Sequence, residues 1–203
     1  MGSKMAKTVL SPAQQLRALM EPELPKRLTK HIDRVVTLAS ELARRHGADE
    51  ARATLAAQGH DLVRHWSDEQ WLAEAEARGI EVLPVDRANP VLLHGPIAAA
   101  ILEERAWLSD PELVSAIRCH TTGHPSYTPE AWCMFLADKF EPNKLKRRPT
   151  LQRVADAAEV GLLEGALAYL ELMEEDGQAK GWDIHPLQTE TLAWLRSQVR
   201  AHA

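Results

Sequence analysis

The stretch that decides the fold is "LTKHIDRVVTLASELARRHG", residues 28–47. Its apolar side chains recur at intervals of three and four residues, which places them on one stripe of an α-helix. The members of the stripe are Leu28, Ile32, Val35, Ala39 and Leu42. Gly47 follows the last of them and is typical of a helix end. The stretch therefore predicts a long amphipathic helix with one face turned to a core.

The same period continues through most of the chain. It predicts further helices over residues 48–65, 67–79, 90–108, 109–120, 128–140, about 151–175, and from about 187 to the end. Asp49, Ser67 and Thr128 are candidate N-caps for three of them. Residues 80–90, 121–127, 141–149 and 176–186 are expected to be turns or loops, and 141–149 is strongly basic. No stretch predicts a credible sheet, so the expected fold is an all-α, single-domain helical bundle.

The composition indicates one soluble globular domain. The chain has 203 residues, of which 45% are hydrophobic and 26% charged, which is ordinary for such a domain. The net charge of −5 argues against a nucleic-acid coat or a basic membrane-surface protein. It leaves room for a small anionic substrate held by a local basic cluster. No run approaches the ~18 apolar residues of a membrane span.

The cysteines and the N-terminus favour a cytoplasmic protein. Cys119 and Cys133 both fall in helical patterns, and two cysteines in a chain of this length form no disulfide framework. We expect both to be free core thiols in a reducing compartment. The first fifteen residues lack a long apolar segment, so secretion is not expected.

Several metal-ligand residue types fall on apolar helix faces. At offsets of three, four and seven from apolar side chains stand His31, His60, His94, His120 and Asp138. A buried carboxylate without a partner is severely penalised, and a buried histidine needs its ring nitrogens satisfied. A hydrogen-bonded structural role is the alternative for any one of them. Their conjunction, with Asp61 next to His60, favours one shared cation or a pair.

The pair His60-Asp61 is compatible with an arrangement of two cations. Neighbouring helical residues project about 100° apart, so both side chains can serve one point only with help from a helix end. Such an end suits an Asp61 that bridges two metals with one oxygen toward each. Imidazole and carboxylate ligands favour iron, manganese, cobalt or zinc over a structural zinc finger. Two metals roughly 3.5–4 Å apart are a known arrangement for phosphoryl hydrolysis, with a bridging hydroxide as nucleophile.

The chain resembles the HD-domain metal phosphohydrolases, whose pattern is an early His, an adjacent His-Asp pair and a distant Asp. The segments "LLHGPIAA", "AIRCHTTGHP", "FLADKFEPNK" and "IHPLQTETLAWL" are similar to the YqeK branch. The resemblance spans roughly residues 20–197, so we assign 20–203 to an HD phosphohydrolase domain and 1–19 to an N-terminal extension.

The resemblance implies a helical fold, a two-metal centre that is often iron, and cleavage of diadenosine tetraphosphate into two ADP. It implies that His31, His60, Asp61 and Asp138 hold one metal, and that Asp61, His94 and His120 hold the other.

A polyphosphate substrate needs cationic neighbours, and several stand close to the ligands. We expect Arg64, His124, Lys139 and Lys144 to bind substrate, with Asp61, Arg64 and His124 taking part in catalysis. For the run "KLKRR", residues 144–148, a solvated loop is the alternative. Adenine could stack on an aromatic ring, for which the candidates are Trp66, Trp71, Tyr127 and Trp132, although core packing is the expected role of each.

Several positions depart from the family pattern, among them Lys144, where an Arg is usual, and the turn "HPSYTPEAW". Leu28 stands where an Arg is common, with Arg27 one residue earlier; Gly59 replaces a bulky apolar residue; and Arg64 replaces a Lys. These departures bear on substrate preference and rate. They keep two alternatives open: a single-metal nucleotidase or other nucleotide phosphohydrolase of the superfamily, and a non-catalytic nucleotide-binding regulator. The expected partner is a small nucleotide, with neither nucleic acid nor membrane. The sequence leaves the oligomeric state open, a homodimer being one alternative.

Overall fold

The computed structural model describes residues 9–202, and these are helical without a strand among them. The predicted all-α class is confirmed. The α-helices are α1 (Pro12–Met20), α2 (Lys26–His46), α3 (Glu50–Gly59), α4 (Asp68–Ala77), α5 (Pro84–Ala88), α6 (His94–Glu104), α7 (Pro111–Arg118), α8 (Pro129–Phe140), α9 (Pro142–Arg147), α10 (Gln152–Val160), α11 (Leu162–Lys180) and α12 (Pro186–His202). Short 3₁₀ turns lie at Glu21–Glu23, Pro90–Leu93 and Pro149–Leu151.

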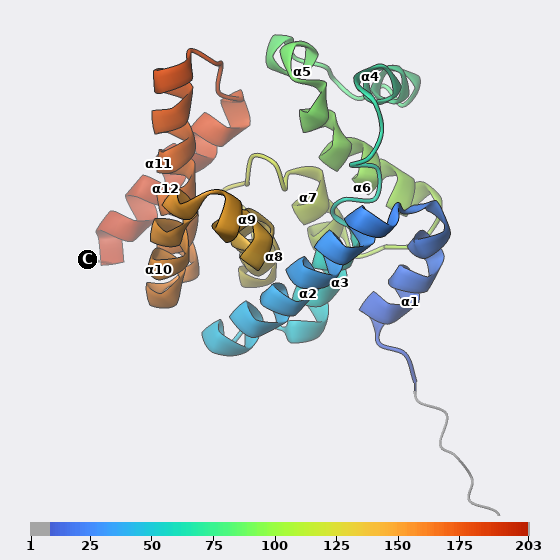
Figure 1. Ribbon diagram of the computed structural model, residues 1–203, viewed down its shortest axis with the longest axis horizontal. Helices are drawn as coiled ribbons and strands as arrows, with labels where there is room; N and C mark the ends of the chain where they lie inside the picture. The colour runs from blue at the N-terminus through green and yellow to red at the C-terminus, as the bar shows by residue number, and fades with distance from the viewer. Residues whose placement is uncertain (1–8, 203) are drawn as a thin grey trace, which may run out of the picture.

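Helix α8 forms the centre of the bundle. Every residue from Ala131 to Phe140 is buried, and α8 packs against α2, α3 and α11. Helices α10–α12 gather on one side of the view in Figure 1 and α4–α6 on the other, with α2, α3, α7 and α8 between them. A polar side chain on α8 is therefore enclosed by helices from distant parts of the sequence.

The apolar stripe of residues 28–47 faces this centre. Ile32, Val35 and Ala39 have no exposed surface, and α2 ends at Gly47 in the left-handed conformation with φ 68°, which glycine adopts without steric cost. The predicted N-caps are also confirmed, since the side chains of Asp49, Ser67 and Thr128 each accept a hydrogen bond from the backbone N–H three residues later.

Several element boundaries differ from those that the sequence predicts. The basic segment 141–149 is not a loop, because Pro142 begins the short helix α9. The single helix expected over about 151–175 is two helices, separated by Gly161 in an extended conformation. Helix α11 continues to Lys180, into the segment expected to be a loop. Helix α3 stops at Gly59 instead of running to residue 65.

Helix α1 covers one edge of the same core. Leu16 and Met20 are buried, and α1 packs against α3, so ordered packing begins before residue 20. The division into a 1–19 extension and a 20–203 domain stays a prediction. Cys119 and Cys133 are free thiols, and burial raises the pKa of Cys133 to about 12. Among residues 9–202 no helix is both long and apolar enough to cross a membrane.

Candidate metal centre

Four histidines and two aspartates from five segments meet beside α8. They are His31 on α2, His60 and Asp61 directly after α3, His94 at the start of α6, His120 just after α7, and Asp138 on α8. All are buried except His31, which is half-buried. The structure thus brings together all six residues predicted to bind metal, while their role as ligands stays a prediction.

Asp61 stands between two groups of imidazoles. Its Oδ2 lies 3.4 Å from His31 Nε2 and 3.5 Å from His60 Nε2. Its Oδ1 lies 3.1 Å from His94 Nε2 and 3.7 Å from His120 Nε2. Helix α3 ends at Gly59, and His60 is its C-cap with helical dihedral angles, φ −57° and ψ −35°, so the His60-Asp61 pair lies at the end of the helix. One carboxylate oxygen therefore faces each group, as a bridging role requires.

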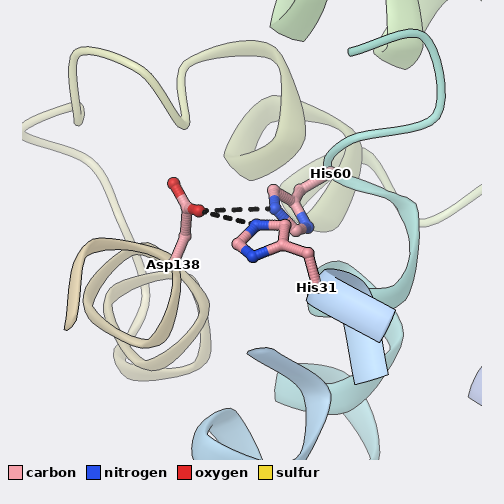
Figure 2. A group of neighbouring side chains, drawn as sticks. All are labelled: His31, His60 and Asp138. Carbon is pink, nitrogen blue, oxygen red and sulfur yellow. Dashed lines mark ion pairs between the residues drawn. The ribbon is translucent and has the colours of Figure 1, made fainter. Parts of the chain in front are cut away.

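Asp138 completes the first group. Its Oδ1 lies 3.3 Å from His31 Nε2 and 3.6 Å from His60 Nε2, and both histidines point toward it in Figure 2. Burial favours the neutral form of Asp138, but the ammonium groups of Lys139 and Lys144, together with hydrogen bonds from His31 and His60, lower its pKa well below the usual range. The carboxyl is therefore ionised, which is the form that binds a cation.

The histidine rings are fixed in the orientation that a metal requires. His60, His94 and His120 each donate a hydrogen bond from Nδ1 to the backbone carbonyl three residues earlier, over 2.7 Å for His60 and 2.8 Å for His120. With the proton on Nδ1, the lone pair is on Nε2 and faces the centre. Burial and the nearby His94 and His60 hold the pKa of His120 well below its usual value, so this ring is neutral.

The free lone pairs give a direct test of whether a cation fits. The buried His60 Nε2 has no hydrogen-bond partner among residues 9–202. His94 Nε2 and His120 Nε2 lie only 2.8 Å apart, although two lone pairs repel at that distance. Atoms that share one ion at about 2.0–2.2 Å lie at most about 4.4 Å apart, and the ligand atoms of each group lie within 4.8 Å of one another, close to that span. The donor set therefore fits one cation in each group.

The centre opens into a cleft of about 940 Å³, which His31 and Asp61 both line. The remaining lining residues come from the segment that begins α2, from the turn after α3, and from α9. They are Pro25, Lys26, Arg27, Leu28, Lys30, Arg34, Arg64, His65, Asn143, Lys144, Lys146 and Arg147. Asp61 contributes the only carboxylate among these lining side chains, so the cleft is strongly cationic.

All six residues of the centre fall within a part of the chain that matches a known family. A family model described as "HD domain" matches residues 28–143. The chain belongs to the HD-domain family. It is 29% identical over 186 residues to "Bis(5'-nucleosyl)-tetraphosphatase, symmetrical" of Bacillus subtilis, covering 91% of this chain and 97% of the relative. A protein of the same name from Halalkalibacterium halodurans is 31% identical over 144 residues, or 71% of this chain and 75% of the relative.

A solved structure supports the fold of this HD domain. It is described as a predicted HD superfamily hydrolase involved in NAD metabolism from Clostridium acetobutylicum, and it superimposes with a TM-score of 0.81 at 24% identity, over 94% of this chain and 99% of that chain. With the curated relatives, the family match identifies the chain as an HD-domain phosphohydrolase.

The surroundings of Leu28 and Gly59, two departures from the family pattern, show how this HD domain accommodates them. Arg27 lies one helical turn before His31, and both line the cleft, because residues three and four apart share a helix face. A Cβ on Gly59 would lie 2.8 Å from Ile117 Cδ1 and 3.0 Å from Leu102 Cδ1. Neighbouring side chains thus fill the space that a bulky residue before the His-Asp pair would occupy.

The predicted substrate-binding residues separate into two pairs. Arg64 and Lys144 line the cleft, and Lys144 Nζ donates to Asp138 Oδ1 over 2.6 Å. Lys139 and His124 are not among the lining residues. Lys139 is buried, and its Nζ donates to Asp138 Oδ2 and to the His120 carbonyl, each over 2.8 Å. This geometry favours a positioning role for Lys139 over substrate contact.

The remaining candidates have structural surroundings. His124 is half-buried, and its Nδ1 accepts a hydrogen bond from the backbone N–H of Ser126. Trp71 and Trp132 are buried in the core, as expected, and Trp71 Nε1 donates to the Val63 carbonyl over 3.0 Å. Tyr127 and Trp66 are partly buried against the same core.

Two contributors to the centre were missed by sequence reasoning. Glu141 is completely buried; its Oε1 lies 3.5 Å from His31 Nδ1, and its Oε2 accepts from Arg34 Nε over 2.6 Å. Gly95 is the second, since a Cβ there would lie 2.9 Å from the Arg118 carbonyl oxygen and 3.0 Å from His120 Nδ1. The hydrophobic periodicity gives no signal for either residue. The only sequence signal for Gly95 is its position beside His94 in the "LLHGP" motif.

Proposed function

We propose that this HD-domain phosphohydrolase cleaves symmetrical dinucleoside polyphosphates, with diadenosine tetraphosphate divided into two ADP. The observation that carries the proposal is Asp61, which presents one oxygen to each of two imidazole groups beneath a cationic cleft. The names of the curated relatives, symmetrical bis(5'-nucleosyl)-tetraphosphatases, support the substrate.

The residues would hold two metal ions. His31, His60 and Asp138 with Asp61 Oδ2 would bind one, and His94 and His120 with Asp61 Oδ1 the other. Bound there, such ions polarise a phosphoryl oxygen and lower the pKa of a water molecule so that it can act as the nucleophile. The ligand types suit iron, manganese, cobalt or zinc, and iron is the ion we expect.

The surrounding side chains orient both the ligands and the substrate. Lys139 and Lys144 hold the two oxygens of Asp138, and Glu141 lies against His31. Arg64 lines the cleft three residues after Asp61, and its guanidinium would bind the phosphate chain. Water attacks one of the two phosphorus atoms beside the central bridging oxygen, and the bond between that phosphorus and the bridging oxygen breaks. The water oxygen stays on the attacked phosphorus, the other half leaves as ADP with the bridging oxygen, and the protons of the water are released to solvent.

The proposal is tested by chromatography of the products from diadenosine tetraphosphate. The purified protein is assayed with iron, manganese or cobalt, and Asp61→Asn serves as the isosteric control. The expected result is ADP as the sole nucleotide product, with little or no product from the variant. AMP plus ATP would contradict symmetrical cleavage. Preference for a nucleoside monophosphate would indicate the single-metal nucleotidase, and tight binding without product the regulator.

A further inference from the structure

The cations of this HD domain that lack an acidic partner are concentrated in the cleft. Eight Lys and Arg side chains pair with no acidic side chain within residues 9–202. They are Lys26, Arg27, Lys30, Arg64, Lys146, Arg147, Arg87 and Arg200. The first six of these line the cleft, whereas Arg87 and Arg200 are exposed elsewhere. Six of these eight unpaired cations therefore lie on one cleft of a chain whose net charge is −5.

The cations at the start of α2 stand where helix physics disfavours them. Lys26 and Arg27 occupy the first turn of α2, which holds no acidic residue, and the N-cap Pro25 offers no side-chain cap. The N-terminus of a helix carries partial positive charge, and Lys26 and Lys30 repel each other one turn apart. Local rules broken in this way are expected at functional sites. We name Lys26, Arg27 and Lys30 the α2 wall.

The second group of unpaired cations lies on α9. Lys146 and Arg147, named the α9 wall, stand in the last turn of that helix, where the dipole stabilises cations. Their place in the last turn of α9 is therefore explained by helix stability alone. Their location in the cleft is not, because they line the same cleft as the α2 wall.

Both walls are continuous with the metal centre. His31 stands on α2 one turn after Arg27, and Lys144 of α9 bonds to Asp138 over 2.6 Å. A phosphate chain whose central bond lies at the metal centre would extend toward residues of both walls. A chain of two phosphates has only one phosphate on each side of that bond, both of them at the metal centre, and no further phosphate that could reach a wall.

Resting on the proposed function, we propose that the two walls select substrates by the number of bridging phosphates. A chain of four or more phosphates contacts the α2 wall and the α9 wall together, and a diphosphate does not. The walls are then specificity determinants that favour dinucleoside tetraphosphates and longer homologues over diphosphate-bridged dinucleotides.

The test removes each wall separately. Lys26→Gln/Arg27→Gln and Lys146→Gln/Arg147→Gln are compared with Arg87→Gln/Arg200→Gln, which removes two unpaired charges outside the cleft. All six side chains are exposed, so the variants should fold, and circular dichroism checks this. Calorimetry measures the binding of inorganic pyrophosphate and inorganic tetraphosphate to the full-length protein in excess metal. Assays then give kcat/KM for diadenosine di-, tri-, tetra- and pentaphosphate.

The wild type is expected to bind tetraphosphate far more tightly than pyrophosphate, and kcat/KM to rise up to at least four phosphates. Loss of two charge-assisted contacts should reduce the tetraphosphate preference by about tenfold or more in each wall variant, while the control keeps it. An unchanged preference in the wall variants, or an equal loss in the control, would overturn the proposal. So would equal competition by a single-stranded oligonucleotide, which would assign the walls to nucleic acid. If no dinucleotide is cleaved, the proposed function fails, and calorimetry still decides the walls independently.

Discussion

The Nε2 atoms of His94 and His120 lie 2.8 Å apart, and the Nδ1 atom of each ring donates to a backbone carbonyl. The two rings thus turn their lone pairs toward each other at the end of α7, beside Asp61 Oδ1. With both Nδ1 atoms donating to carbonyls, a cation shared by the two Nε2 atoms would relieve the repulsion between their lone pairs, so we interpret the pair as part of a metal site.

His120→Ala should remove one metal ion per chain and leave the ion held by His31, His60 and Asp138, because the two groups share only Asp61. Elemental analysis of the purified protein checks this, with His185→Ala as a histidine control outside both groups. Retention of full metal content by His120→Ala would remove that residue from the ligand set.

If Asp61 bridges the two groups, its substitution should lower metal affinity at both of them. Asp61→Asn keeps the shape of the side chain but replaces an anionic oxygen with an amide, so affinity at both groups should fall. Loss of a residue that only orients a ligand already costs about 10- to 100-fold, so kcat/KM should fall by about 100-fold or more. Metal content and activity are measured on the same sample. A variant that loses only one ion would show that Asp61 serves one group and does not bridge.

Substitution of Lys139 tests whether this residue positions Asp138 or contacts the substrate. Lys139→Met leaves Asp138 Oδ2 without its buried donor, and breaking a buried ion pair costs about 3 kcal/mol. Urea unfolding should therefore show a clear loss of stability, and metal affinity should fall with it. Lys146→Met, on the exposed face of α9, is the matched control and should change the free energy of unfolding by less than about 0.5 kcal/mol. Normal stability with a raised KM alone would instead make Lys139 a substrate contact.

Gly95 sets the approach of α6 to the end of α7. A methyl group at this position would meet backbone oxygen at 2.9 Å and the His120 ring at 3.0 Å, so Gly95→Ala should separate the helices that carry His94 and His120. Such overpacking costs about 1–3 kcal/mol, and the melting temperature and metal content should both fall. Alanine stabilises an unobstructed helix relative to glycine. A gain in stability would therefore show that close contact at position 95 does not set the distance between α6 and the end of α7.

Arg64 tests the phosphate contact. Its guanidinium lies 5.8 Å from the centre of the Trp71 ring and lines the cleft. Arg64→Ala should lower kcat/KM by about tenfold or more, as expected for a lost charge-assisted contact, and leave the metal content unchanged. Arg64→Lys should recover part of the loss, since the charge remains but the planar fork does not. Full activity of Arg64→Ala with normal metal content would exclude it from the mechanism.

The sequence predicted the class of the fold and the members of the centre for the same reason. His31 and Asp138 interrupt apolar stripes, and burial of such groups is costly unless they share partners. Periodicity therefore revealed which polar side chains turn inward. That these side chains converge on one centre could be inferred only because several of them turn inward. The apolar stripe of a single helix does not specify the angle at which that helix packs against its neighbours.

What sequence reasoning missed depends on tertiary contacts. The basic segment after α8 was expected to be a loop, yet Pro142 begins the helix α9 there, where Glu141 caps Asn143 N. Gly161 lay inside an apparently continuous helical pattern, and its extended conformation was not visible in composition. The role of Lys139 was hidden because a lysine beside a ligand suggests substrate binding until its burial is known.

The central claim, that Asp61 joins two cation sites, is tested most directly by anomalous X-ray scattering from a crystal of the metal-loaded protein. We predict two peaks for each chain. One should lie within coordination distance of His31, His60, Asp138 and Asp61 Oδ2, and the other within that distance of His94, His120 and Asp61 Oδ1. A single peak, or peaks away from Asp61, would contradict the account.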